Sequence, residues 1–461
     1  MPNKLMTINI PDQVKEIAAT LQDANFEVYL VGGPIRNILL EKSVKDWDLT
    51  SSATPDKMLS LFPDAFYDNS FGTVGIPLNK HTEDQMIVEV TTFRTEYGYS
   101  DNRHPDKISW GKNITEDLSR RDFTVNAMAV PLVKNELIFE NVVDPFSGQK
   151  DLEKKIIRAV GNPKERFKED ALRLMRAIRF ATQLGFSIEK ETLLAITQDA
   201  SLIQNIASER IKVELMKILE SEYPYDGILL LKNTGLLHYI LPELLEGIDI
   251  SQKRPGRHHT TDVFEHNIFS LKFCPSPDPI VRFATLIHDV GKPRVAAKDQ
   301  DGYVIFHNHE IVGSRMAYDI CDRLRFSKKE REKITKLIRW HMFTVDEHIT
   351  DSAVRRFIRR IGVENVKDMM DLRIGDRLGG GTQTAESWRL KLFKKRVEEQ
   401  LAPAPFSIND LAIDGNDVMK ELKIKPSRQI GDLLQKLFEE VDEDLSKNTK
   451  EYLFKRLKEL A

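Results

Sequence analysis

Cysteine is scarce, long apolar runs are missing, and the net charge is close to zero. The two cysteines, Cys274 and Cys321, are too few for a disulfide framework or a cysteine-based zinc site, which fits a reducing compartment. No apolar stretch approaches the roughly 20 residues that cross a bilayer, and the N-terminus lacks the charged and then apolar layout of a signal peptide. These absences predict a cytoplasmic protein without membrane association, and nothing in the composition implies a protein partner.

A strongly basic composition, which often marks nucleic-acid-binding proteins, is also missing, because the formal net charge is -3. Basic residues nevertheless gather in two short segments, which contain Arg355, Arg356, Arg359 and Arg360 in one case and Arg389, Lys391, Lys394, Lys395 and Arg396 in the other. A solvated helix face and a phosphate-contacting stripe are both compatible with such runs, and the sequence leaves both interpretations open.

The chain is long enough for several domains. With 461 residues, of which 41% are hydrophobic, it is expected to form more than one hydrophobic core. Residues 1–150 mix strand and helix signals, whereas apolar residues three and four apart dominate the remainder, as in amphipathic helices. Expected strands cover residues 26–31, 72–77 and 86–92, and expected helices cover residues 34–40, 170–184, 208–219, 263–273 and 281–288. The pattern predicts an α+β domain followed by helical ones.

The first chemical signal is a double glycine followed by two aspartates. Gly32 and Gly33 precede an expected helix that carries Arg36, and Asp46 and Asp48 come next in an expected strand. Paired glycines ahead of a helix leave room and free N–H groups for a triphosphate. Two residues apart in a strand, the aspartates would present their carboxylates to one point.

Mg²⁺ suits such a pair, because it is a hard ion that prefers oxygen ligands and keeps positions open for substrate phosphates. Glu89, in the expected strand of residues 86–92, is the candidate third carboxylate of a two-metal site. An isolated Asp-x-Asp is more often a surface loop, so the prediction depends on the combination of glycines and carboxylates at this spacing. Asp46, Asp48 and Glu89 are therefore the expected catalytic metal ligands.

Further motifs follow in a fixed order. They are Val-Glu-Val-Thr-Thr-Phe-Arg at 88–94, Arg-Arg-Asp-Phe-Thr-Val-Asn-Ala at 120–127, Glu-Asp-Ala-Leu-Arg at 169–173 and Ser-Glu-Arg-Ile-Lys-Val-Glu-Leu at 208–215. The set resembles the polymerase-β-type nucleotidyltransferases and, within them, the bacterial class II tRNA nucleotidyltransferase (CCA-adding enzyme) and poly(A) polymerase family. The resemblance covers roughly residues 25–240 and implies tRNA, CTP and ATP as partners.

The resemblance also implies roles for individual residues. Arg121, Asp122 and Asn126 would hold the triphosphate and ribose of the incoming nucleotide, and Glu209 and Arg210 would brace a helical neck. One departure concerns the position after the arginine of the double-glycine motif. The family usually has aspartate there and this chain has Asn37, which removes a charge near the triphosphate site without touching the metal ligands.

Asp170 and Arg173 could select the base. They lie three residues apart on an expected helix and would form a hydrogen-bond acceptor beside a fork of donors. Cytosine and adenine each show an amino donor next to a ring-nitrogen acceptor, which satisfies this pair, whereas uracil and guanine do not. A mismatched buried polar group costs about 1–3 kcal/mol, enough for strong rejection. An ordinary surface ion pair is the alternative interpretation.

The motifs indicate nucleotide addition more clearly than they indicate which nucleotides are added. Relatives that add only CC lack much of the loop after the third carboxylate, whereas residues 95–110, including Asp101 to Pro105, are present here. That argues against CC addition alone but does not separate CCA addition from A-only addition. A poly(A) polymerase would be expected to be more basic and to carry a long charged C-terminal extension.

Histidines concentrate in the second half of the chain. Eight of the 11 lie between residues 258 and 348, and an Asp follows directly after His288. Imidazole and carboxylate groups that converge from several helices suit Zn, Mn, Fe, Co or Ni at a hydrolytic site. The ordered set resembles the HD phosphohydrolase superfamily and consists of His266, His288, Asp289, His309, His341 and Asp376.

By that resemblance His266, His288, Asp289 and Asp376 would hold a first metal, and His309 and His341 would help to hold a second one. The metal would be Mn, Ni, Co, Fe, Zn or Mg. His258, His259, His307 and His348 have no position in the motif and are interpreted as surface or substrate-contacting residues.

The sequence thus predicts an α+β protein, with a nucleotidyltransferase head that contains a small mixed sheet, followed by an all-helical neck, HD domain and tail. The expected boundaries are 1–150, 151–245, 246–380 and 381–461. The expected function is template-independent addition of CCA to tRNA, together with a phosphohydrolase activity. A-only addition, poly(A) synthesis and an HD phosphohydrolase with a nucleotide-sensing head are the alternatives.

Overall fold

The computed structural model describes residues 10–44, 46–67, 72–77, 87–97, 107–111, 113–133, 136–253, 261–343, 345–346, 348–401 and 407–461. The chain forms two compact units, Met1–Pro242 and Glu243–Ala461, and each is described by itself. Across the described ranges, no helix is both long enough and apolar enough to cross a membrane. The loop residues Asp101 to Pro105, and His258 and His259, lie outside the described residues.

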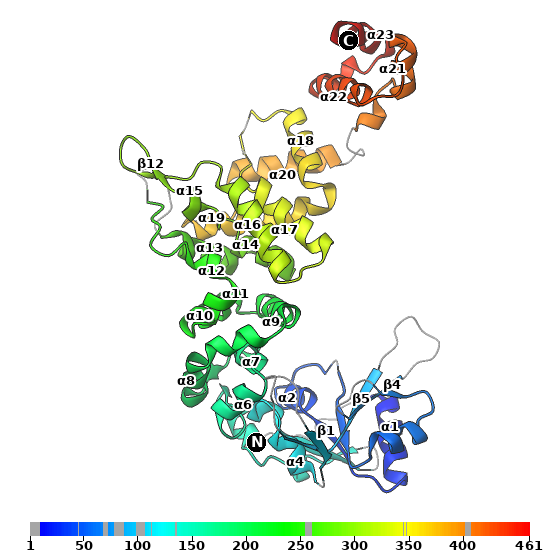
Figure 1. The fold of residues 1–461 in the computed structure, drawn as a ribbon, viewed down its shortest axis with the longest axis vertical. Coiled ribbons are helices and arrows are strands. Elements are labelled where there is room, and N and C mark those ends of the chain that lie inside the picture. The colour runs from blue at the N-terminus through cyan, green and yellow to red at the C-terminus, as the bar shows by residue number, and fades with distance from the viewer. Residues whose placement is uncertain are drawn as a thin grey trace. The chain divides into compact units, whose positions relative to one another are not determined.

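The N-terminal unit contains a seven-stranded mixed sheet (Figure 1). Its strands run in the order β3 (Phe66–Tyr67), β4 (Thr73–Pro77), β5 (Ile87–Thr92), β2 (Leu49–Ser51), β1 (Val28–Val31), β8 (Ala129–Val133) and β9 (Glu136–Leu137). β2 and β5 pair in parallel, and the other neighbours are antiparallel. A separate hairpin joins β6 (Arg94–Tyr97) to β7 (Lys107–Trp110).

Side-chain patterning explains the position of the central strands. β1 is almost continuously buried, as expected for a strand covered on both faces, whereas β5 alternates, with Val88 and Val90 in the core and Glu89 exposed. The parallel register pairs Leu49 with Val90. The residue before Leu49 therefore lies close to Glu89, at the edge where the first candidate site is found.

Helices cover the sheet and continue beyond it. The N-terminal unit contains α1 (Asp12–Asp23), α2 (Gly33–Leu39), α3 (Pro55–Leu61), α4 (Ile114–Ser119), α5 (Gly148–Glu153), α6 (Pro163–Glu169), α7 (Leu172–Leu184), α8 (Lys190–Gln198), α9 (Ser208–Glu220), α10 (Pro224–Asn233) and α11 (Leu236–Ile240). Short 3-10 helices are η1 (Thr124–Asn126), η2 (Phe139–Asn141) and η3 (Ala200–Asn205). Asn113 and Asn162 start α4 and α6 by accepting a backbone N–H from the first turn. α12 (Pro242–Leu245) spans the boundary between the units.

The C-terminal unit is mainly helical. It contains α13 (Val263–Phe273), α14 (Pro279–Leu286), α15 (Lys292–Val295), α16 (His309–Arg323), α17 (Lys328–Trp340), α18 (Asp351–Ile361), α19 (Val366–Gly379), α20 (Trp388–Leu401), α21 (Gly415–Leu422), α22 (Arg428–Glu443) and α23 (Lys450–Leu460), with 3-10 turns η4 (Val363–Asn365), η5 (Ile408–Asp410) and η6 (Leu445–Lys447). The all-helical prediction after residue 150 misses two pairs of two-residue strands, β10 (Ile156–Ile157) with β11 (Ser187–Ile188) and β12 (Ala297–Lys298) with β13 (Val304–Ile305).

Glycine sets the spacing between α13 and α19. A Cβ on Gly375 would lie 2.6 Å from the carbonyl oxygen of Ser270, and one on Gly379 would lie 2.5 Å from the Ser270 nitrogen. Both distances are shorter than van der Waals contact, so only glycine allows the two helices to pack this closely. The close packing brings His266 on α13 toward Asp376 on α19.

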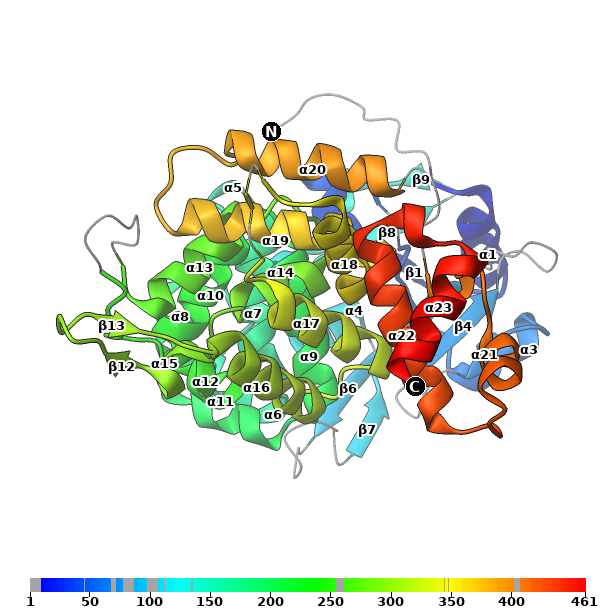
Figure 2. The same cartoon turned by 90° about the horizontal axis from the view of Figure 1, so that it is seen from above.

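The C-terminal helices are attached to this bundle through a buried ion pair. α22 lies beside α18 (Figure 2), where Arg355 donates through Nε to Asp442 Oδ1 at 2.7 Å and Arg359 donates to both carboxylate oxygens at 3.1 and 2.5 Å. Burial raises the pKa of Asp442, but the two arginines outweigh it and hold the pKa below its usual value. Two of the four arginines in this basic run therefore have a structural partner.

Candidate active sites

A cavity of about 350 Å³ lies in the N-terminal unit at the edge of β2 and β5. Six arginines and four carboxylates dominate its wall. It is lined by Val31, Asp48, Leu49, Thr73, Glu89, Thr91, Arg94, Arg120, Arg121, Asp122, Asp170, Leu172, Arg173, Arg176 and Arg210. A dense arginine lining of this kind suits a polyanionic ligand, since guanidinium groups bind phosphates through paired N–H donors.

The two aspartates do not lie within a strand, in contrast to the sequence prediction. Asp46 and Asp48 precede β2, which begins at Leu49, so the polar residues occupy the approach to the strand. Asp48 and Glu89 line the cavity together, whereas Asp46 is exposed and is not among the lining residues. Burial raises the pKa of the Asp48 carboxyl, Arg121 opposes this, and the negative charge of Asp46 adds to it.

Gly32 makes room for an arginine. It ends β1 with a φ of 72°, and a Cβ at this position would lie 3.0 Å from Arg121 Nη1. Arg121 is fixed from the other side by the buried Asp117, whose Oδ2 accepts from Arg121 Nη2 at 3.2 Å. Asp117 also accepts from Arg120 Nε at 3.0 Å. Gly33 begins α2, so the double glycine leads directly from strand to helix.

Arg36 and Asn126 are connected to each other. Arg36 Nη1 donates to Asn126 Oδ1 at 2.7 Å, and its Nε and Nη2 donate to Asn37 Oδ1 at 3.2 and 3.0 Å. Burial lowers the pKa of Arg36 to about 10, although Asp122 opposes the shift. Asn37, the departure from the family pattern, therefore keeps the hydrogen-bond acceptor for Arg36 while it lacks the negative charge.

Asp122 is a buried carboxylate with its partners in place. Its Oδ2 accepts from Arg176 Nε at 2.8 Å and Nη2 at 2.5 Å, while Oδ1 accepts from Asn126 Nδ2 at 3.3 Å. Burial raises the pKa of Asp122, but Arg176 outweighs burial and the pKa falls to about 2. The sequence did not single out Arg176, although a buried aspartate requires such a partner.

Asp170 and Arg173, the pair predicted to select the base, line the same cavity, but their local geometry differs from the prediction. Asp170 ends α6 with extended backbone and precedes α7, so it is not on the helix that carries Arg173. Arg210 Nη2 donates to Asp170 Oδ2 at 3.0 Å. Arg173 Nη1 donates to Glu169 at 2.6 Å, and its Nη2 donates to the carbonyl oxygen of Arg120 at 3.0 Å. Both side chains are thus held in place by other residues of the unit.

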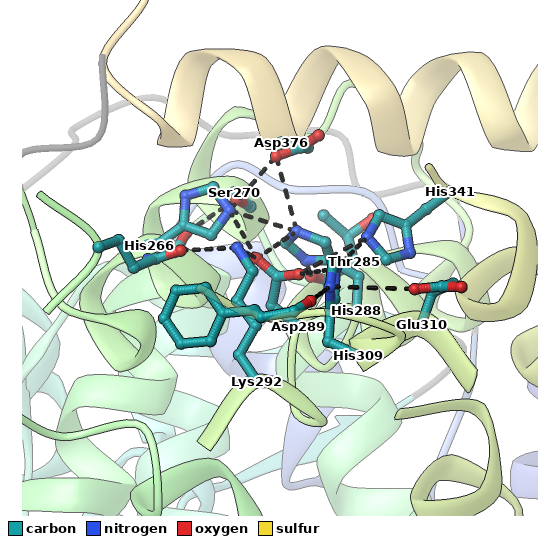
Figure 3. Close-up of polar contacts among 12 residues, drawn as sticks. His266, Ser270, Thr285, His288, Asp289, Lys292, His309, Glu310, His341 and Asp376 are labelled. Atoms are coloured by element: carbon teal, nitrogen blue, oxygen red, sulfur yellow. Dashed lines mark hydrogen bonds and ion pairs between the residues drawn. The ribbon is translucent and has the colours of Figure 1, made fainter. Parts of the chain in front are cut away.

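The second candidate site is a buried histidine–aspartate cluster in the C-terminal unit (Figure 3). His266 Nε2 lies 3.3 Å from His288 Nε2, 3.2 Å from Asp289 Oδ2 and 3.3 Å from Asp376 Oδ1. His288 and Asp289 lie in the turn directly after α14, not on the helix as expected.

Asp289 also faces a second group of histidines. Its Oδ1 lies 3.2 Å from His309 Nε2 and 3.6 Å from His341 Nε2, and these two ring nitrogens are 3.3 Å apart. His309 begins α16 and His341 follows the last residue of α17. One carboxylate therefore lies between two groups, each with three donor atoms within 4.8 Å of one another.

Backbone carbonyls orient three of the rings. The Nδ1 atoms of His288, His309 and His341 contact the carbonyl oxygens of Thr285, Phe306 and Ile338 at 2.8, 2.8 and 2.7 Å, respectively. A carbonyl oxygen can only accept, so each Nδ1 carries a proton, and whenever such a ring is neutral its Nε2 lone pair points inward. Two Nε2 lone pairs 3.3 Å apart repel each other unless a proton or a metal ion lies between them.

Charged neighbours complete the cluster. Burial lowers the pKa of His288, but Asp289 and Asp376 outweigh it and raise the pKa to about 10, so this position favours a positive charge. Lys292, which was not predicted from the sequence, is buried, contacts Asp289 Oδ2 and donates to Gln252 Oε1 at 2.6 Å. Its position three residues after Asp289 was the available signal. Arg373 donates to Asp376 Oδ2 at 2.8 Å.

Comparison with known proteins gives a consistent assignment. Residues 28–158 match the family described as "Poly A polymerase head domain", residues 185–247 match "Probable RNA and SrmB- binding site of polymerase A", and residues 307–457 match a second domain assigned to tRNA nucleotidyltransferases. A CCA-adding enzyme of Ligilactobacillus salivarius is 31% identical over 98% of both chains. The chain belongs to the tRNA nucleotidyltransferase family.

Other family members show how broad the match is. The A-adding tRNA nucleotidyltransferase of Deinococcus radiodurans is 33% identical over 89% of this chain and 90% of its own length. Matches to two further CCA-adding enzymes cover only 66% and 53% of those proteins. The crystal structure of the Bacillus stearothermophilus CCA-adding enzyme in complex with CTP has a TM-score of 0.72, with 24% identity over 97% of each chain, and supports the α+β fold.

Proposed function

We propose that this protein adds CCA to the 3′ end of tRNA, with CTP and ATP as nucleotide donors. The observation that carries the proposal is the N-terminal cavity, where Asp48 and Glu89 lie among six arginines. Carboxylates for a metal and guanidinium groups for phosphates are the two components that nucleotidyl transfer requires. The full-length family match supports the same reaction.

The carboxylates fit Mg²⁺. Asp48 and Glu89 lie on neighbouring chain segments at one edge of the cavity, offer only oxygen ligands, and Asp46 precedes them in the same approach to β2. Glu89 and the two aspartates would hold the ion, which when bound neutralises charge on the attacking hydroxyl and the departing pyrophosphate. A short shift of the segment before Leu49 would be needed for Asp46 to reach the cavity.

The protein's own residues position the nucleotide. Gly32 leaves space for the triphosphate and for Arg121, whose guanidinium lines the cavity and would bind the phosphates. Asp122 and Asn126, held by Arg176 and Arg36, would orient the ribose. Since these side chains already have partners, little ordering is required when the nucleotide enters.

Base selection would follow from Asp170 and Arg173. With its carboxylate fixed by Arg210, Asp170 would accept from the amino group of cytosine or adenine, and Arg173 would donate to the neighbouring ring nitrogen. Uracil and guanine reverse both groups and would leave a buried polar pair unmatched, which costs about 1–3 kcal/mol per group.

A-only addition is the second candidate product, because the Deinococcus radiodurans relative that bears that name matches at 33% identity. Incorporation of labelled CTP and ATP into tRNA transcripts that lack A, CA or CCA separates the products. CCA addition predicts extension of all three transcripts. Extension of the A-lacking transcript alone would establish A-only addition, and long A tracts on unrelated RNA would indicate a poly(A) polymerase.

We further propose that the C-terminal unit is a metal-dependent phosphohydrolase of the HD type. The buried cluster fits two divalent ions such as Mn, Ni, Co, Fe, Zn or Mg, because the ring lone pairs converge and Asp289 lies between the two groups. His266, His288, Asp289 and Asp376 would hold one ion, and His309 and His341 would hold the other together with Asp289. When bound, such ions lower the pKa of a water ligand to about 7.

A phosphohydrolase on this chain would prepare damaged tRNA ends for nucleotide addition. A tRNA end that carries a 2′,3′-cyclic phosphate has no free 3′-hydroxyl to extend, so its hydrolysis would prepare the acceptor. The test is release of phosphate, or opening of a 2′,3′-cyclic phosphate, by the wild-type protein with Mg²⁺, Mn²⁺, Co²⁺, Ni²⁺ or Zn²⁺. Absence of turnover with all five metals would reject the proposal, as it would the rival interpretation of a hydrolase with a nucleotide-sensing head.

A further inference from the structure

A second cavity of about 350 Å³ opens in the C-terminal unit, and none of the clustered histidines and aspartates lines it. Four aromatic side chains and three arginines contribute to its wall, which also includes Glu310 and Met342. Met342 is 60% exposed, which places a flexible apolar side chain at the surface of this region. This composition differs from a packed core and from a purely ionic surface.

The cavity adjoins the histidine cluster at two places. Glu310, in the cavity wall, has its Oε2 4.0 Å from Nδ1 of its neighbour His309 (Figure 3). Phe343, also in the wall, is covered by the guanidinium of Arg373 at 5.6 Å, and the same guanidinium donates to Asp376. The cavity wall is therefore connected through Glu310 to His309, and through Phe343 and Arg373 to Asp376.

The basic run on α18 separates into two pairs with different surroundings. Arg355 and Arg359 bind Asp442, as described above. Arg356 and Arg360, one helical turn apart, line the cavity and are exposed. Two guanidinium groups on one helix face, directed to a cavity, can bind a phosphate through several N–H donors. Arg355 and Arg359 thus form a structural ion pair with Asp442, whereas Arg356 and Arg360 form a candidate anion site.

The aromatic wall can accommodate a planar ring. Phe343, Phe357 and Phe393 pack together with centroids 4.8 to 5.3 Å apart. The guanidinium groups of Arg339 and Arg360 lie 4.4 and 4.7 Å from the centre of the Trp340 ring, which orients them before any ligand binds. Nucleobases stack on aromatic rings and on guanidinium planes alike.

We propose that this cavity binds a nucleotide, with its phosphate at Arg356 and Arg360 and its base against the aromatic wall. The nucleotide is either a free mononucleotide or the end of a single-stranded RNA. Nucleotide binding in this cavity does not require a phosphohydrolase. The further step, that a nucleotide is also the substrate of the histidine cluster, rests on the proposed phosphohydrolase function.

Photolabelling of the full-length protein tests binding at a mapped position. 8-Azidoadenosine monophosphate is cross-linked to the wild-type protein, and labelled peptides are identified by mass spectrometry. Label is expected in residues 339–360 and should fall at least tenfold in the Arg356→Gln/Arg360→Gln variant, because the loss of even one charge-assisted contact weakens binding about tenfold. Lys328→Gln/Lys395→Gln removes two exposed charges outside the cavity and should label like wild type. Equal melting temperatures verify folding.

Label confined to residues 10–242, or unchanged label in the arginine variant, would overturn the proposal. An RNA oligomer with 8-azidoadenosine at its 3′ end forms the second arm: label from the oligomer identifies an RNA end, and label from the mononucleotide alone identifies a free nucleotide. Hydrolysis is measured separately with β-glycerol phosphate, which has no base. Labelled cavity peptides without any hydrolysis would support nucleotide binding while rejecting the phosphohydrolase.

Discussion

At the scale of single residues, each candidate site depends on a few charged groups fixed by partners of opposite charge. Asp122 is held by Arg176, Asp170 by Arg210 and Asp289 by Lys292. These arrangements set the direction of each carboxylate before a substrate arrives. Pre-orientation matters because nucleotidyl transfer gains most of its rate from positioning and from charge stabilisation.

Asp48→Asn should abolish nucleotide addition while the fold is retained. The amide keeps the shape of the side chain but removes the negative charge that a divalent ion requires. Metal assistance is worth several kcal/mol, so the rate of CTP incorporation should fall by about a thousandfold. Single-turnover incorporation into tRNA measures the effect, and Asp56→Asn, an exposed aspartate on α3, is the matched control. Near-normal incorporation by Asp48→Asn would show that the metal assignment is wrong.

Arg210→Gln should weaken base discrimination. Arg210 does not need to contact the base; its role would be to hold Asp170, with Nη2 3.0 Å from Oδ2. Loss of this charged contact should lower kcat/KM for CTP about tenfold and raise the ratio of UTP to CTP incorporation. The change in ratio distinguishes positioning from a general structural defect.

Arg158→Gln provides the comparison, because Arg158 pairs with Asp151 and Glu189 and is not among the residues that line the cavity. It should leave the UTP to CTP ratio unchanged. An Arg210→Gln enzyme with wild-type discrimination would contradict the proposed role of this ion pair.

At the scale of helices and strands, the spacing of apolar residues predicted where helices and strands occur better than it predicted the residues at which they begin and end. The strands around Val28 and Val90, and the helices α7, α9 and α13, follow the apolar spacing of the sequence. Asp48, Asp170 and His288 were assigned to regular elements and lie just outside them. Periodicity cannot reveal such ends, because they depend on backbone hydrogen bonds and caps.

Partner residues were the least predictable part of the sites. Arg176 and Lys292 are far in sequence from some of the groups that they contact, such as Asp122 and Gln252. Only the fold shows that they meet. The motif residues could be proposed from spacing and resemblance because their chemistry is recognisable without a contact map. Their catalytic roles and the four-part division of the chain stay predictions.

Gly379→Ala should disturb the histidine cluster through helix packing alone. A Cβ there would lie 2.5 Å from the Ser270 nitrogen, so α13 and α19 would have to move apart. Overpacking of this kind costs about 1–3 kcal/mol, and His266 would move away from Asp376. A lower melting temperature and a lower metal content, measured by mass spectrometry after metal loading, are expected.

Gly431→Ala is the matched control in the same unit. It lies in α22, and a Cβ there would meet nothing within 4 Å among the described atoms. Replacement of an exposed helical glycine by alanine should stabilise the protein by about 0.5–1 kcal/mol without change in metal content. If both variants retain full metal loading, the spacing of α13 and α19 does not control the cluster.

At the scale of the whole molecule, the two candidate sites are built in separate compact units with different chemistry. The N-terminal site combines carboxylates with arginines in a cavity, whereas the C-terminal site is a buried cluster of histidines and aspartates. No residue of one cluster belongs to the other unit. The two proposed reactions should therefore be separable by substitution, even if they act on the same tRNA.

The last prediction is a reciprocal loss of the two activities. Asp289→Asn removes the negative charge that lies between the two groups of ring nitrogens, so metal binding should weaken and phosphoester hydrolysis should fall by about a thousandfold. Nucleotide addition should stay within about twofold of wild type, since Asp289 is not among the residues that line the N-terminal cavity. Asp48→Asn should show the opposite pattern, with hydrolysis retained.

Both rates are measured on one preparation of each variant, with melting temperature as the check on folding. Hydrolysis by Asp289→Asn at the wild-type rate would show that the histidine–aspartate cluster does not catalyse this reaction. Parallel loss of both activities in either variant would show that the two sites do not act independently.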